Sequence, residues 1–353
     1  MINQSEGPAC ADARKSVTNT EDTEETKGTK KEAQLGFYLP SCTPWPPCSL
    51  LLLGFRHPTT PAQAIVSSLA RISPAMQNST RRSAHEIFEQ VVKNAREELS
   101  RSVPALLFSG FAGGIGMGLT GLGVALALSY LGNSPTAKFI SFCFYPIGFI
   151  VVIIGRAQLF TENTLFPVVL ILDERKHLFV TLRLWGLVFV SNVAGAVFFG
   201  WLLMKTGALA PNFADALAGL GTDAAQGHFT LIFAKGVIGG WLIALVAWMV
   251  TASHWTIGQV VITWMLTFIV GAGHFSHCIA SSAEIVAAVM AGHLHFSNYF
   301  GWLLPATLGN IVGGVFIVSV LNYGQVRIGS EESEAESAEE RSEEKQSQEE
   351  AAD

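Results

Sequence analysis

Two histidines, a run of hydroxyl side chains and a carboxylate lie together in GHFSHCIASSAE, at residues 273–284. The segment follows WMLTFIVGA and precedes IVAAVMAG, and both runs are typical of membrane-buried helix. Histidine titrates near neutral pH, and its ring can donate or accept a hydrogen bond. Polar groups at membrane depth are costly and mark paths for ions, protons or polar solutes. The segment therefore predicts such a path.

Composition places these residues in an integral membrane protein. The chain has 353 residues, of which 50% are hydrophobic and 14% are charged, against roughly 25% charged in soluble domains. Charges are sparse between Pro104 and Tyr323. The acidic end, residues 326–353, predicts a disordered cytoplasmic tail. No basic patch with interleaved aromatics indicates nucleic acid, and the five cysteines show neither disulfide nor zinc spacing.

The N-terminal part differs from the rest. Residues 1–82 predict a disordered extension, and residues 1–75 are consistent with an over-extended gene start, because the apolar run at 50–53 is too short to span a membrane. Ser83 and Glu86 then match a capping box. An apolar stripe at helical spacing predicts an amphipathic helix over 83–102, lying at the cytoplasmic membrane surface.

Six apolar stretches must position the polar segment. Arginine and lysine gather before the first stretch and between the second and third, which puts those connections and both termini in the cytoplasm of a multi-pass inner (plasma) membrane protein. The channel domain is expected over 103–325. Its stretches fall at about 104–131, 138–160, 181–204, 229–252, 257–291 (interrupted) and 298–322.

A shift of 118 residues aligns the two halves of this domain. It places Asn192 on Asn310 and Gly155 on Gly273, and also matches Phe111 to Phe229 and Gly118 to Gly236. A repeat of three spans must insert its second copy upside down, and inverted repeats place a substrate path near paired broken helices at the midplane. We therefore expect an all-α protein with broken second and fifth helices.

At these residues the chain resembles the formate/nitrite transporter family of pentameric channels for small monovalent anions. The resemblance covers about residues 84–325. It rests on G-x6-G-x-A-x-L-F-T at 148–161, F-x-H-x-I-A at 275–280 and G-N-I-V-G-G at 309–314. It implies an aquaporin-like protomer with its own pore, a homopentamer in the lipid bilayer, and no cofactor or metal.

The motifs also imply site residues. His277 becomes the central pore histidine, and Phe275 contributes to an apolar constriction. The remaining pore residues carried over are Leu159, Phe160, Thr161 and Asn310. The chain departs from the pattern at Ser281, where the better-studied members have Asn, at Gly240, where formate channels tend to have Asn, and at the additional carboxylate of Glu284. Ser281, Glu284 and His274 are accordingly the candidates for selectivity.

Our hypothesis is that His277 and Thr161 hydrogen-bond the anion and support its transient protonation, with the proton taken from water or from the ring. The alternatives are an aquaporin-like pore for a neutral solute and a non-transporting membrane sensor. A structural role remains open for Glu284, with Lys235 or Arg156 as a buried partner. A metal or haem site is disfavoured because no second ligand cluster accompanies His274 and His277. An enzyme is disfavoured because no nucleophile, base and orienting group fall in a recognisable order.

Overall fold

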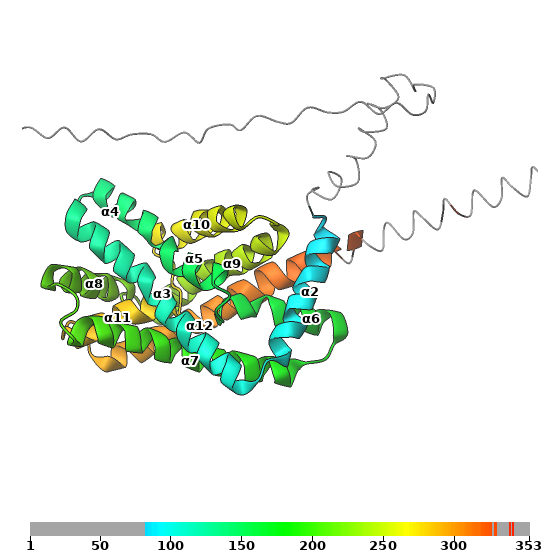
Figure 1. Cartoon of the computed structure of the whole chain (residues 1–353), viewed down its shortest axis with the longest axis horizontal. Helices are drawn as coiled ribbons and strands as arrows, with labels where there is room; N and C mark the ends of the chain where they lie inside the picture. Colours follow the sequence, from blue (N-terminus) through cyan, green and yellow to red (C-terminus); the bar gives the residue numbers. More distant parts are fainter. Residues whose placement is uncertain (1–81, 327, 330–338, 340, 342–353) are drawn as a thin grey trace, which may run out of the picture. The chain divides into compact units, whose positions relative to one another are not determined.

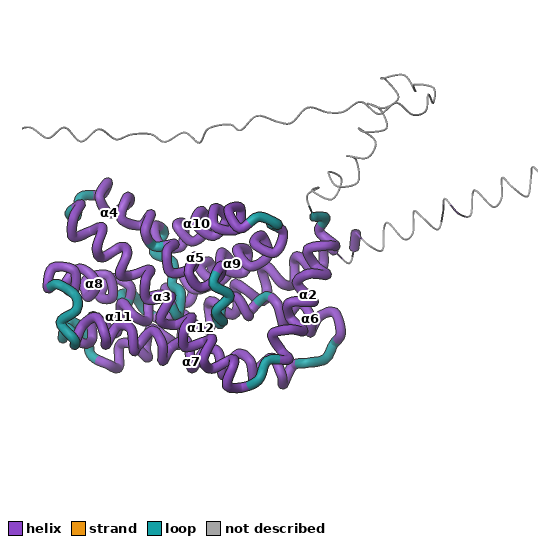
Figure 2. Tube along the Cα trace, in the orientation of Figure 1, coloured by secondary structure: helices purple, strands orange, loops and turns teal. Residues whose placement is uncertain are grey.

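The computed structural model describes residues 82–326, 328, 329, 339 and 341. The predicted N-terminal extension, except residue 82, and most of the predicted acidic tail lie outside these residues. Every regular element in 82–326 is helical (Figure 2). Five helices are long and apolar enough to cross a membrane, namely Val103–Leu131, Pro135–Ile154, Leu178–Lys205, Phe229–Ala252 and Phe296–Val326.

The helix bounds follow the predicted stretches closely. In chain order they are α2 (Ala84–Ser100), α3 (Val103–Leu131), α4 (Pro135–Ser141), α5 (Pro146–Ile154), α6 (Phe166–Glu174), α7 (Leu178–Lys205), α8 (Pro211–Ala224), α9 (Phe229–Ala252), α10 (Thr256–Ala272), α11 (Ala280–Met290) and α12 (Phe296–Val312), with a π-helical continuation η3 (Gly313–Val320) and the short 3-10 turns η1 (Phe142–Phe144) and η2 (Glu162–Thr164) (Figure 1). The sequence analysis did not expect α8, which lies in a connection without strong hydropathy.

Two helices are interrupted, and both end in the same way. α5 stops at Gly155 and α10 stops at Gly273, and each glycine is followed by a non-glycine residue with left-handed backbone, Arg156 at φ 57° and His274 at φ 52°. The amide of the following residue then donates to the carbonyl five positions earlier in the chain: Ala157 donates to Val152, and Phe275 donates to Val270. These bonds satisfy carbonyls at the helix ends, as helix-ending motifs with a left-handed residue commonly do. All these equivalent positions are 118 residues apart.

The register predicted for the first helix of each half was wrong. Asn192 donates to the Gly110 carbonyl in α3, and Asn310 donates to the Gly236 carbonyl in α9, so these two helices correspond at a shift of 126 rather than 118. Phe111 therefore does not correspond to Phe229, nor Gly118 to Gly236. α3 is five residues longer than α9, and the helical segment at 135–154 is three residues longer than α10.

Glycines allow the long helices to touch. A Cβ on Gly114 of α3 would lie 2.0 Å from the Asn192 carbonyl oxygen, and one on Gly240 of α9 would lie 2.2 Å from that of Asn310. α7 packs against α3, and α12 packs against α9, at these points. Small residues let backbones approach in this way within membranes. Gly240, one of the departures noted above, thus allows the α9–α12 contact.

The helix α2 begins with the predicted capping box, in which Ser83 and Glu86 bond to each other's backbone. Its apolar stripe, which includes Ile87, Phe88 and Val91, is buried against protein. The stripe meets residues of α6, α9 and η3, and α2 lies beside α6 in Figure 1. Protein therefore covers the stripe, and the location of α2 at the membrane surface stays a prediction.

Candidate functional site

A direct hydrogen bond joins the two breaks. Thr161 follows α5 and His277 follows α10, and the Thr161 hydroxyl lies 2.8 Å from Nε2 of His277. Both side chains are fully buried, with exposed fractions of 0%. The motifs therefore identified two residues that are 116 positions apart in the chain and adjacent in space.

The surroundings of His277 select one form of its ring. The Ala280 amide at the start of α11 donates to Nδ1 over 3.0 Å, so Nδ1 carries the lone pair. The neutral ring then holds its proton on Nε2, which donates to Thr161. A proton added at Nδ1 would face the Ala280 N–H and break that bond. The geometry thus favours neutral imidazole with its donor aimed at the hydroxyl.

An asparagine holds each break by three hydrogen bonds. Asn310 accepts from the Cys278 amide at 2.9 Å and donates at 2.8 Å to the carbonyls of Ser276 and Gly236. Asn192 makes the equivalent bonds around the first break, accepting from the Phe160 amide at 2.8 Å. The side chain of Asn192 also donates to the carbonyls of Gly110 and Gln158. Irregular backbone at membrane depth requires such internal partners. Asn310 therefore holds the segment that carries His277.

Apolar side chains enclose the pair. The Phe149 ring meets the His277 imidazole edge-on, with ring centres 5.0 Å apart. Leu159 and Phe160, both carried over by motif, are buried at 1% and 3% exposure. Phe275 is only half buried and lines a cavity on one side. A dry environment strengthens every electrostatic interaction within it.

That cavity has a volume of about 910 Å3 and is bounded by α3, α4, α8, α9, α10, α11 and α12. His274, Ser281 and Glu284, the candidates for selectivity, all line it, whereas His277 and Thr161 do not. No ion pair joins Glu284 to Lys235 or Arg156 among the described residues, although Lys235 lines the same cavity. The two partners suggested from the sequence therefore do not bind it directly.

Cavity residues from α8 and α12 were missed by sequence reasoning. Asp215 and Asp223 lie on α8, and Trp302 lies on α12. α8 has only 14 residues and is less apolar than the membrane-spanning helices, so the hydropathy analysis passed over it, although its prolyl start is a helix signal. Trp302 belongs to an apolar helix whose sequence gives no sign of a cavity.

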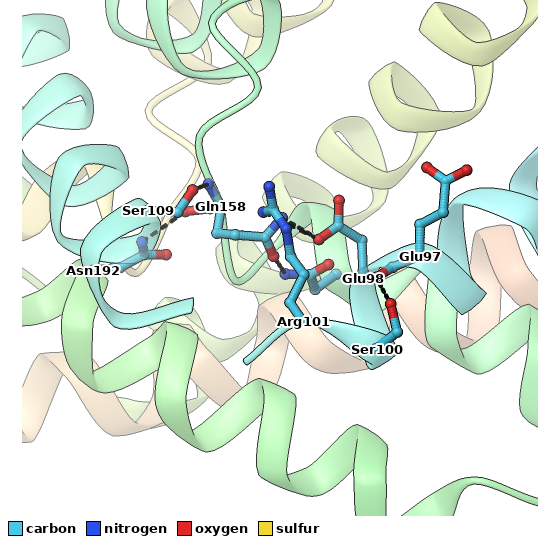
Figure 3. A network of polar contacts seen from close by, with 8 residues as sticks. Glu97, Glu98, Ser100, Arg101, Ser109, Gln158 and Asn192 are labelled. Atoms are coloured by element: carbon cyan, nitrogen blue, oxygen red, sulfur yellow. Dashed lines mark hydrogen bonds and ion pairs between the residues drawn. The ribbon is translucent and has the colours of Figure 1, made fainter. Parts of the chain in front are cut away.

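A polar network lies beside the first break (Figure 3). The side chain of Gln158 donates to Glu98 of α2 at 2.6 Å and accepts from Asn163 at 2.8 Å. The backbone amide of Gln158 donates to the hydroxyl of Ser109. Arg101 forms an ion pair with Glu98 at 3.3 Å. Burial raises the pKa of Glu98, opposed by Arg101 and by the bond from Gln158. The network connects α2 to the backbone that leads into Thr161.

No cluster of three or more metal-ligating side chains exists among the described residues.

Comparison with known proteins gives a consistent result. Residues 85–324 match the family model described as formate/nitrite transporter. The chain is 32% identical over 247 residues to "Inner membrane protein YfdC" of Escherichia coli (strain K12), covering 69% of this chain and 79% of that protein. It is 29% identical over 258 residues to "Uncharacterized transporter YrhG" of Bacillus subtilis (strain 168), covering 69% and 92%. It is 25% identical over 243 residues to "Formate channel BtFdhC" of Bacillus thuringiensis, covering 66% and 91%.

Two solved structures share the fold. An "FNT family ion channel" superposes with a TM-score of 0.60 at 19% identity, covering 68% of this chain and 99% of that one. A "Pentameric formate channel with formate bound" superposes with a TM-score of 0.53 at 21% identity, covering 67% and 98%.

Proposed function

We propose that this chain, which belongs to the formate/nitrite transporter family, moves a small monovalent weak-acid anion or its conjugate acid across a membrane. The chain is a multi-pass membrane transporter or channel rather than an enzyme. The observation that carries the proposal is the hydrogen bond between His277 and Thr161, which sets two polar groups between broken helices inside an apolar enclosure.

In this enclosure the solute has a lower free-energy cost as the neutral acid than as the anion. A bare charge at the bilayer centre costs several kcal/mol at least. Protonating a carboxylate with a pKa near 4 costs only about 4 kcal/mol at pH 7, at roughly 1.4 kcal/mol per unit. A weak acid can therefore cross such a constriction protonated at lower cost than as an anion. The Nε2–H of His277 and the Thr161 hydroxyl would hydrogen-bond the solute in transit.

The fixed ring form argues against His277 as the proton source. The ring already donates from Nε2, and giving up that proton would require Nδ1 to be protonated against the Ala280 amide. Of the two sources left open by the sequence, the ring and bulk water, water outside the constriction is the better supported. His277 then positions the solute as a donor.

The topology belongs to the same proposal. The half-helices α10 (17 residues) and α11 (11 residues) together make one interrupted span, so that six spans form two inverted three-span repeats in an aquaporin-like protomer. Both termini lie in the cytoplasm, and the membrane is the inner (plasma) membrane, as the name of the Escherichia coli relative suggests. The proposal includes a homopentamer, and the similar fold of the "Pentameric formate channel with formate bound" supports this part of it.

Uptake by purified protein in liposomes tests the function. The panel is formate, nitrite, hydrosulfide, acetate and lactate, each measured from pH 5 to 8. We expect uptake of at least one anion that rises with an inward proton gradient and falls at least tenfold in His277→Ala. His293→Ala changes an exposed histidine outside the site and serves as the control. Normal uptake by His277→Ala would refute the role of the site, and uptake indifferent to the gradient would support a neutral-solute pore.

A further inference from the structure

We propose that Glu284, with Ser281 and Trp302, forms a proton-donating subsite in the cavity, where the anion is protonated before it reaches His277. This inference rests on the proposed function, because it assigns the proton source for the same transported acid. Three observations carry it: the place of Glu284 in the cavity, the way the fold makes room for it, and the unpaired polar groups beside it.

Polar residues connect Glu284 to the constriction. Ser281 and Glu284 are three residues apart in α11, so their side chains share one face of that helix, and both line the cavity. His277 lies just before α11 in a non-helical segment, where its carbonyl accepts from the Ser281 amide at 3.2 Å. Ser276, the residue before His277, also lines the cavity, whereas His277 itself bonds to the buried Thr161. The cavity wall therefore includes residues on both sides of His277 in the chain.

The fold makes space for this carboxylate. A Cβ on Gly121 of α3 would lie 2.5 Å from Cγ and 2.9 Å from Oε1 of Glu284. A Cβ on Gly221 of α8 would lie 1.9 Å from the backbone carbonyl oxygen of Glu284, so this glycine lets α8 approach the backbone of α11. Gly121 thus leaves the space that the Glu284 side chain fills, and Glu284 has only 6% of its surface exposed.

The polar groups of the subsite have no partners within the described part of the chain. The indole N–H of Trp302, a cavity-lining residue at 1% exposure, has no acceptor. No side-chain hydrogen bond or ion pair is recorded for Glu284 or for the Ser281 hydroxyl. Buried polar groups are nearly always bonded in native proteins, so exceptions point to a ligand or to water. A carboxyl, a hydroxyl and an N–H donor match a small carboxylic acid, which needs both donors and acceptors.

The charges around Glu284 leave it unpaired. α8 presents Asp215 and Asp223 to the cavity, α9 presents Lys235, and α4 presents Lys138. His274 and Tyr145 face it from the end of α10 and the start of α5. α3 and α12 carry no charged residue, and Lys205 of α7 instead donates to the Met290 carbonyl. Among the described residues none of these charges forms an ion pair with Glu284, so its carboxyl is available to an anion that enters the cavity.

The proton balance is simple. The O–H bond of the Glu284 carboxylic acid breaks, and its proton forms an O–H bond to the carboxylate oxygen of the bound anion. The neutral acid moves past Ser281 to the constriction, and Glu284 remains as a carboxylate until water in the cavity returns a proton. A strong-acid anion such as nitrate accepts no proton at this step, so it does not enter the constriction as a neutral acid. The subsite thus selects weak acids.

The test uses the full chain in liposomes, with formate and nitrate as probes from pH 5 to 8. Glu284→Gln keeps the shape and removes the acidic proton. We expect its formate uptake to fall at least tenfold and to lose its dependence on the proton gradient, while nitrate uptake stays at the wild-type level because nitrate takes no proton from Glu284. Glu89→Gln makes the same change at an exposed carboxylate of α2 that does not line the cavity; it is the matched control and should behave as wild type.

The outcomes separate the two proposals. Wild-type protein that transports no weak-acid anion refutes the proposed function itself. Wild-type transport with an unchanged pH profile in Glu284→Gln leaves that function standing and overturns the subsite. If the variant fails to fold, infrared difference spectra of wild-type protein decide: 13C-labelled formate must perturb a protein carboxyl band, and the absence of that change overturns the inference.

Discussion

Asn310→Ala is predicted to destabilise the protein strongly, because the side-chain amide of Asn310 makes the three hydrogen bonds that hold the second break. The change leaves the Cys278 amide and the Ser276 carbonyl without the partner that each has at 2.8–2.9 Å. The third acceptor, Gly236, lies within α9 and keeps its helical partner. Each buried group left unsatisfied costs about 1–3 kcal/mol, although hydrogen bonds measured within membranes average nearer 0.6. We therefore expect a total of about 2–4 kcal/mol.

The assay is thermal unfolding of the purified protein in detergent. At about 2–4 °C per kcal/mol for a domain of this size, the midpoint should fall by roughly 5–15 °C. Asn192→Ala should match it, since Asn192 makes the equivalent three bonds at the first break. Asn298→Ala, in the same helix as Asn310, removes one exposed bond to the His295 amide and is the control. Equal midpoints for Asn310→Ala and Asn298→Ala would refute the reasoning.

Two further predictions concern packing and pH. Gly240→Ala should cost about 1–3 kcal/mol in unfolding experiments, because its Cβ would lie 2.2 Å from the Asn310 carbonyl oxygen, whereas Gly186→Ala, with no atom within 4 Å, should be neutral or stabilising. An equal effect of both changes would contradict the packing argument. The raised pKa of Glu98 means that its contribution to stability is present below its unfolded pKa and is lost as pH rises through the folded value. Thermal midpoints measured against Glu98→Gln from pH 4 to 8 should show the wild type losing its relative stability as pH rises, and a constant difference would exclude this linkage.

Hydropathy and motif spacing predicted much of the fold. The span at 229–252 has the predicted bounds, and the capping box at Ser83 and Glu86 is confirmed. The match of Gly155 to Gly273 also holds, because both end a half-helix before a left-handed residue. Each of these features is determined by residues close together in the sequence, so a local sequence pattern is enough to predict it.

The first helix of each half shows where such reasoning fails. Glycine recurs so often in α3 and α9 that several registers match about equally well. Only the contacts of Asn192 and Asn310, made across the fold, identify 126 as the correct shift. The cavity was missed for the same reason, because α8 and Trp302 join it through packing between distant segments. The surroundings of Glu284 could not be read from its neighbours in the chain.

The position of each asparagine has a consequence for biosynthesis. Asn192 follows Phe160 by 32 residues, and Asn310 follows Cys278 by the same 32. During translation, each interrupted helix therefore leaves the ribosome one full helix before the side chain that satisfies its exposed backbone. The second break stays incomplete until almost the whole membrane domain has been made. In a nascent chain arrested before α12, the backbone groups of the second break have no hydrogen-bond partner from Asn310. We expect quality-control proteases of the membrane to recognise such a chain.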